Sequence, residues 1–120
     1  MMVKINMPKH NSFLNTPPAA VEQALLQLGR NIRTARLRRN LRLSDLAERI
    51  GVSRYLISDI EKGKPSASIA AYVGALWALG LIDELRHVAD PDHDTEGKAL
   101  ESARSPKTAS KRKKVLDNDF

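Results

Sequence analysis

Apolar residues recur at helical intervals in the middle of the chain, and the longest run predicts a helix over residues 17–39. Its apolar stripe consists of Val21, Leu25, Leu28, Ile32 and Ala35. Thr16 precedes two prolines, so we expect Thr16 to be the N-cap and Pro17 the first helical residue. Asn40 is expected to end the helix, because asparagine tolerates the left-handed backbone conformation.

Two shorter apolar segments follow, joined by Gly51, Val52 and Ser53. Each segment places its apolar residues on one helix face, and these are Leu46, Ala47 and Ile50, then Leu56, Ile57 and Ile60. Gly51 suits a sharp turn, Ser53 can cap the second helix, and Gly63 follows its end. Two short helices joined in this way form a helix-turn-helix unit, whose second helix can enter a DNA major groove.

The pattern predicts two further helices before residue 89. Ser66 or Ser68 caps a helix over residues 68–79, which is ended by Gly80. Its predicted buried stripe is Ile69, Tyr72, Val73 and Leu76, and a short fifth helix carries Ile82, Leu85 and Val88. Trp77 lies off this stripe and is expected in the core or at a dimer edge rather than as a platform for a ligand. The predicted fold class is therefore an all-α, five-helix domain with disordered tails.

The two ends of the chain lack this pattern, so we divide it into an N-terminal arm (1–16), a folded domain (17–89) and a flexible C-terminal tail (90–120). In the arm, Val3, Ile5 and Met7 alternate with polar residues, which fits either a strand paired with another chain or a loose segment. In the tail, the basic run 111–114 is either a phosphate-binding patch or a solvated charge run. Residues 115–120, which end in Phe120, are compatible with a peptide that docks on a partner.

The distribution of charge along the chain indicates a class of binding partner. The chain has a net charge of +6, and residues 1–89 hold 13 Lys and Arg against 7 Asp and Glu. No acidic residue interrupts the arginines between Arg30 and Arg42. Such a cluster favours a polyanionic partner, with a solvated basic face as the alternative. The chain has no cysteine, and no segment is apolar and long enough to be a signal peptide or a membrane span, so a cytoplasmic protein is expected.

Residues 28–85 resemble the XRE, or Cro-type, family of helix-turn-helix repressors. The matching positions are Leu41, Leu46, Ala47, Gly51, Val52, Ser53, Ile57, Ser58, Glu61 and Gly63. The resemblance implies a lambda-repressor-like DNA-binding domain. The chain departs from the family at Arg42 and Leu43, where a capping threonine and a DNA-contacting glutamine are usual, and Ser44 is expected to become the cap.

The exposed face of the second helix carries polar and charged residues near its N-terminus, where a recognition helix meets base edges. The residues expected to bind DNA are Leu43, Ser44, Ser53, Arg54, Tyr55, Ser58, Asp59, Lys62 and Lys64. Arg54 is the expected partner of a guanine, and Lys64 of a phosphate. Tyr55 is expected to contact either a thymine methyl group or a phosphate. Asp59 is expected either to accept from a cytosine amine or to orient Arg54 or Lys62.

Arg36 and Glu61 stand at positions that resemble those of a buried ion pair in this family, which joins the first helix to the recognition helix. We therefore expect Arg36 to fix the position of the recognition helix and not to contact DNA.

No catalytic constellation is apparent, so an enzyme is not expected, and neither is a cofactor. His10, His87 and His93 lie in separate regions of the sequence. The acidic stretch after Asp90 spaces its carboxylates like a calcium-binding loop, but Thr95 stands where that loop needs glycine, so no metal site is expected.

The sequence predicts a DNA-binding transcriptional repressor that binds double-stranded operator DNA as a homodimer. By analogy of size and organisation, it resembles the HipB-like antitoxins, which also bind a HipA-type kinase toxin. A standalone phage-type or metabolic repressor is the alternative within the same class. An interaction module that bridges other proteins is the alternative from a different class.

Overall fold

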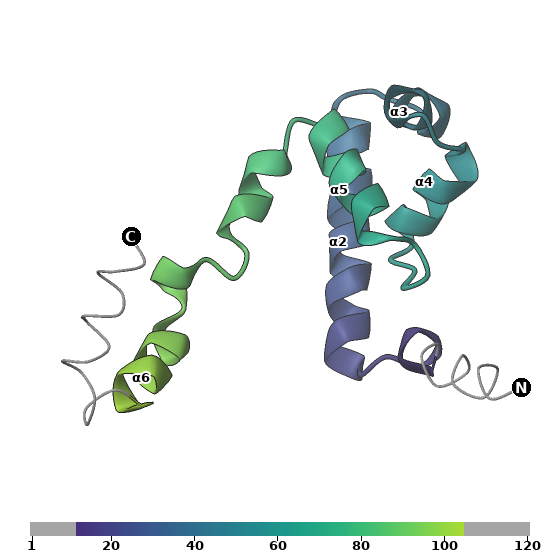
Figure 1. Cartoon of the computed structure of the whole chain (residues 1–120). Coiled ribbons are helices and arrows are strands. Elements are labelled where there is room, and N and C mark those ends of the chain that lie inside the picture. Colours follow the sequence, from purple (N-terminus) through teal and green to yellow (C-terminus); the bar gives the residue numbers. More distant parts are fainter. Residues whose placement is uncertain (1–11, 105–120) are drawn as a thin grey trace, which may run out of the picture. The chain divides into compact units, whose positions relative to one another are not determined.

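A computed structural model describes residues 12–104 and contains only helices in that range (Figure 1). The α-helices are α2 (Ala19–Arg38), α3 (Leu43–Ile50), α4 (Arg54–Glu61), α5 (Ile69–Ala78) and α6 (Thr95–Arg104). Two 3₁₀ helices, η1 (Ile82–His87) and η2 (Pro91–His93), lie between α5 and α6. The chain divides into two compact units, Met1–Leu85 and Arg86–Phe120. The prediction of an all-α fold with about five main helices is confirmed.

Helix α2 begins two residues later than predicted, and Thr16 does not cap it. Pro18 occupies the N-cap position, and the hydroxyl of Thr16 donates instead to the carbonyl of Ser12. Residues 12–15, which belong to the predicted N-terminal arm, are themselves helical. A prolyl residue at the cap has no side-chain acceptor, which leaves the first amides of α2 without a side-chain partner. The predicted strand at Val3, Ile5 and Met7 lies outside the described residues.

Residues with positive φ end α2, α4 and α5. Asn40 has φ 55° at the end of α2, as predicted, and Gly63 and Gly80 have φ 69° and 77° after α4 and α5. Past Asn40, the amide of Leu41 donates to the carbonyl of Arg36, which closes the last turn of α2. These helix ends leave short connections, which bring the elements of the first unit into contact.

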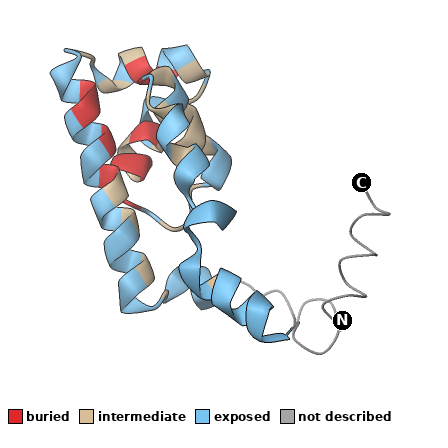
Figure 2. Ribbon diagram, turned by 90° about the vertical axis from the view of Figure 1, so that its left-hand side faces the viewer, coloured by how far each residue is buried: buried red, intermediate tan, exposed pale blue. Residues whose placement is uncertain are grey.

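The core of the first unit lies where α3, α4 and α5 meet and where α4 contacts α2 (Figure 2). Ile32, Leu46, Ile57 and Ile60 are its largest fully buried side chains. All four belong to predicted apolar stripes, so the spacing of apolar residues predicted the core of α2, α3 and α4.

Helix α5 matches its predicted stripe only in part: Tyr72 is buried and Leu76 packs against the core, as predicted, but Ile69 is not buried. Tyr72, Ala75 and Leu79 are buried, whereas Ile69 is 73% exposed. The helix contains no charged residue, so no polar face marks the side that points to solvent. Trp77 is 59% exposed, which excludes a core position.

The second unit contains a helix where a flexible tail was predicted. Helix α6 spans ten residues, and none of them is buried. Its start is held locally, because the carboxylate of Asp94 accepts from the amide of Gly97 at 2.9 Å. The prediction from composition is corrected for residues 95–104, where helix-forming residues (Glu, Lys, Ala, Leu and Arg) predominate and Asp94 caps the first turn. The basic run 111–114 and the segment 115–120 lie outside the described residues.

Candidate nucleic-acid interface

The turn between α3 and α4 has the geometry that its sequence predicts. Gly51 has φ 84°, and no atom lies within 4 Å of where its Cβ would be. Its amide and that of Val52 both donate to the carbonyl of Ala47. The hydroxyl of Ser53 accepts from the amide of Leu56 at 3.2 Å and caps α4. These bonds fix the direction in which α4 leaves the turn.

A buried ion pair joins α4 to α2. Arg36 and Glu61 form two parallel hydrogen bonds, Nε to Oε2 at 2.6 Å and Nη2 to Oε1 at 3.0 Å. Nη1 of Arg36 also donates to the carbonyl of Leu41 at 2.8 Å. The predicted pair therefore forms, with every nitrogen of the guanidinium engaged. A planar, bidentate bond of this kind restricts both position and rotation of the helix that it holds.

Two glycines let backbones meet at this junction. A Cβ on Gly29 in α2 would lie 2.6–2.7 Å from the carbonyl oxygens of Glu61 and Ile60. A Cβ on Gly63 would lie 2.6 Å from the carbonyl oxygen of Leu25. Helix α2 and the end of α4 are therefore closer than any side chain permits. Gly63 was predicted as a helix end, but the role of Gly29 was not, because a glycine inside a helical pattern gives no sign of what it faces.

Helix α3 begins without help from Ser44. Its N-cap is Arg42, whose backbone amide donates to the carboxylate of Asp45 at 2.8 Å, and the Ser44 hydroxyl makes no cap bond. The guanidinium of Arg42 also donates to Asp45, with Nε and Nη2 each 3.2 Å from a carboxylate oxygen. These hydrogen bonds lower the pKa of Asp45 and raise the pKa of Arg42. The predicted capping role of Ser44 is thus wrong, and the hydroxyl is left exposed.

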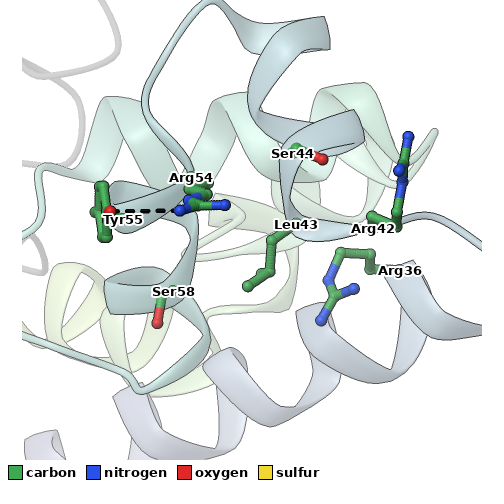
Figure 3. A pocket seen from close by; sticks show the side chains of 7 residues that line it. All are labelled: Arg36, Arg42, Leu43, Ser44, Arg54, Tyr55 and Ser58. Atoms are coloured by element: carbon green, nitrogen blue, oxygen red, sulfur yellow. Dashed lines mark hydrogen bonds between the residues drawn. The ribbon is translucent and has the colours of Figure 1, made fainter.

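An open cleft of about 660 Å³ lies between the N-terminal ends of α3 and α4 (Figure 3). Its lining residues come from α2, α3 and α4 and are Arg36, Arg42, Leu43, Ser44, Arg54, Tyr55 and Ser58. Five of the nine predicted DNA-binding residues are among them: Leu43, Ser44, Arg54, Tyr55 and Ser58. The structure therefore gathers these five around one surface, although they come from two helices.

Arg54 and Tyr55 form one exposed unit at the start of α4. The guanidinium carbon of Arg54 lies 5.3 Å from the centroid of the Tyr55 ring, and Nη2 is 3.4 Å from the tyrosine hydroxyl. Tyr55 is 68% exposed. A cation–π contact leaves the guanidinium charged, so Arg54 remains able to donate hydrogen bonds to a partner.

The predicted residues outside the cleft include a second cation, Lys64, at the loop after α4. Its ammonium group is 3.1 Å from the carboxylate of Asp59, and its carbonyl accepts from the hydroxyl of Tyr72 at 2.9 Å. Burial raises the pKa of Tyr72, with a smaller contribution from Asp59. Asp59 was predicted, as one of two alternatives, to orient Arg54 or Lys62. It pairs instead with Lys64. Lys62 is exposed at the C-cap of α4.

Arg42 lines the cleft but was not among the residues predicted to bind DNA, because its sequence position indicated only a departure from the family pattern. The signal that identifies its role is Asp45 three residues later, the spacing of a capping box.

Within residues 12–104, no group of three or more His, Asp or Glu side chains is placed to hold a metal ion. No helix in that range is long and apolar enough to cross a membrane.

The chain matches the profile of a known protein family but no individual curated protein or solved structure. Neither the curated proteins nor the solved structures contain a significant match to the chain. The profile of one family matches residues 27–89, which include α3, α4, α5 and the cleft. Domains of this family indicate DNA binding and transcription regulation, and they are typical of non-enzymes. By this match, which covers more than half of its length, the chain belongs to the helix-turn-helix domain family.

Proposed function

We propose that the protein is a sequence-specific repressor that binds double-stranded operator DNA through α4 and the N-terminal end of α3. One observation carries this proposal: Arg54, Tyr55 and Ser58 of α4 share an open cleft with Leu43 and Ser44 of α3. In helix-turn-helix domains the N-terminal residues of the second helix meet base edges in the major groove. Arg54 is then expected to bind a guanine, since its guanidinium can donate to both the O6 and the N7 acceptor of that base.

The internal bonds of the domain support this assignment, because they separate positioning residues from contacting ones. Arg36 lines the cleft, but its three nitrogens are occupied by Glu61 and Leu41. Lys64 lies away from the cleft, on a loop held by Tyr72. A phosphate is the expected partner of Lys64, because phosphate contacts position a protein without reading sequence.

Binding as a homodimer is the second part of the proposal. Ile69, Val73 and Trp77 follow one another at four-residue intervals on α5, with Ile69 and Trp77 well exposed. In a chain with a net charge of +6, a helix without charged residues is the surface where two copies meet with the least repulsion. Two such domains would place their recognition helices in successive major grooves of a palindromic operator.

The test compares three alanine variants on selected and on random DNA duplexes. Arg54→Ala is expected to lose about 1–3 kcal/mol of discrimination, because it removes a base contact. Lys64→Ala is expected to weaken all duplexes alike and to reduce the salt dependence of log K by about one unit. Arg104→Ala in α6 removes the same charge elsewhere and serves as the control. Equal losses of Arg54→Ala on both kinds of DNA would refute its role as a base reader.

An antitoxin role within a toxin–antitoxin operon stays a prediction, as does a HipA-type kinase partner. The matched family is not specific to HipB-like proteins. Purification of the tagged chain from its host, with and without residues 90–120, tests both points. A kinase that co-purifies in equal amounts and is lost with residues 90–120 would support them. A dimer that carries only DNA would favour a standalone repressor.

The protein-bridging alternative makes the opposite prediction about DNA. An interaction module would show no salt-dependent DNA binding, whereas the proposed repressor loses affinity steeply with salt.

A further inference from the structure

The proposed reading cleft has one aliphatic side chain in its lining, that of Leu43. The other lining residues are three arginines, two serines and a tyrosine. Leu43 is half-buried and packs partly against the core, while the rest of its side chain faces the cleft. In Figure 3 it lies in the middle of the cleft, between Arg54 on one side and Arg36 on the other. An apolar group in this position has no hydrogen bond to offer a base, so it must select by shape and by contact with another apolar group.

The arginines around Leu43 differ in what they are free to bind. Arg36 is engaged by Glu61, and Arg42 by Asp45. Among the described residues, Arg54 is the one cleft arginine that forms no ion pair with a carboxylate. The cleft therefore offers one available guanidinium beside one aliphatic surface.

These two groups match two neighbouring features of a major groove. Guanine presents O6 and N7 as acceptors, and a C5-methylated pyrimidine presents a methyl group. We propose that Leu43 reads the C5 methyl group of a pyrimidine in the base step next to the guanine bound by Arg54. This inference rests on the proposed function and adds the chemistry of one base to it. Thymine and 5-methylcytosine carry the same methyl group, so DNA methylation would change affinity at this position.

The expected effect is modest and measurable. Burying one methyl group against an aliphatic side chain changes affinity by about fourfold. Arg54 forms hydrogen bonds with a different base, so its contribution is largely independent of the methyl group. A methyl-reading residue is therefore visible as a fourfold step on top of the guanine contact.

The experiment begins with selection of tight-binding duplexes from a random pool by the full-length protein. In the selected duplex each thymine is replaced in turn by deoxyuridine, which lacks only the methyl group. One position in each half-site, next to a guanine whose contribution disappears in Arg54→Ala, is expected to lose about fourfold in affinity. Replacement of the same base pair by C·G, with and without a C5 methyl group on the cytosine, distinguishes the two sources. A gain on methylation extends the reading to 5-methylcytosine, and no gain restricts it to thymine.

Three variants assign the effect to Leu43. Leu43→Met keeps an aliphatic surface and is expected to keep the dependence on the methyl group. Leu43→Gln has similar length but a polar end, and it is expected to bind methylated and unmethylated sites equally. Ser44→Ala changes a neighbouring lining residue and, whatever its effect on overall affinity, is expected to keep the dependence on the methyl group. Thermal unfolding of each variant confirms that the domain is folded at the temperature of the assay.

The outcomes separate this inference from the proposed function. If no duplex is enriched, the proposed function itself fails. If a duplex is enriched but deoxyuridine has no effect at any position, DNA reading stands and methyl reading is overturned. An equal deoxyuridine effect in Leu43→Gln and in the wild type would assign the methyl contact to another residue.

Discussion

Helices α4 and α6 begin in the same way and are held very differently. Both have a side-chain oxygen before their first residue, from Ser53 and from Asp94, that accepts from an amide three residues on. Helix α4 has eight residues and buries Ile57, Ile60 and Glu61, whereas the ten-residue α6 buries none. A cap therefore decides where a helix starts, and burial decides how firmly it is held. The contrast fits the proposed role of α4 as a recognition helix, which must present its side chains in one orientation.

The largest expected effect comes from removing the charge that α4 buries. Glu61→Ala should destabilise the first unit by about 3–5 kcal/mol, because Arg36 would keep a buried charge without a partner. Chemical denaturation followed by circular dichroism measures the change. Glu48→Ala removes an exposed carboxylate from α3 and should change stability by less than about 0.5 kcal/mol. In the double variant Arg36→Met with Glu61→Leu, most of the lost stability should return, and no recovery would contradict a cost that arises from the unpaired charge.

A smaller effect is expected where the end of α4 meets α2. Gly63→Ala should cost about 2–3 kcal/mol, because it combines a strained positive φ with a clash against the backbone of Leu25. Gly51→Ala should cost only about 1 kcal/mol, because Gly51 has a similar φ but open space around its Cβ position. Thermal unfolding of the two variants under one condition compares them. Equal losses would mean that φ alone matters at both sites.

The caps themselves allow a direct comparison. Ser53→Ala should destabilise the first unit by about 1 kcal/mol, since α4 unfolds with the core. Asp94→Ala should leave that unfolding transition unchanged and lower the helix content of α6 alone. Residue-specific amide hydrogen exchange distinguishes the two results. A shift of the main transition by Asp94→Ala would show that α6 is coupled to the core.

The smallest expected effect is a dependence on pH at the start of α3. The hydrogen bond from Arg42 holds the pKa of Asp45 below its usual value of 3.8, so the folded state binds this proton less readily than the unfolded state. The contribution of Asp45 to stability is therefore present above that value and is lost as the pH falls through the lowered pKa. Wild type and Asp45→Asn should differ at neutral pH and converge in acid. A difference that persists at low pH would contradict this origin.

The sequence was sufficient to predict the elements whose signals are local. Ser53 and Asn40 stand at helix ends in the roles that their side chains favour, and Ile57 and Ile60 are buried where their spacing places them. The pair of Arg36 and Glu61 followed from a family resemblance and was not evident from spacing alone. Local chemistry and family pattern together therefore located both helices of the helix-turn-helix unit.

What escaped prediction depends on contacts between distant parts of the chain. Gly29 matters because the carbonyls of Ile60 and Glu61 lie against it, and no pattern around residue 29 indicates that approach. Ile69 was wrongly included in the buried stripe of α5, whereas Tyr72 of the same stripe is buried as predicted; all ten residues of the helix lack charge, so composition did not separate the two. Lys64 was expected near DNA, but its pairing with Asp59 required the turn at Gly63 to bring the two together.

Trp77 has a consequence for spectroscopy. It is the only tryptophan in the chain, and 59% of its surface is exposed on α5. Its indole is already in contact with water in the folded state, so its emission should change little when the domain unfolds. Anything that covers the outer side of α5 should shift that emission to shorter wavelength. The intrinsic fluorescence of this protein is thus a label-free reporter of association rather than of folding.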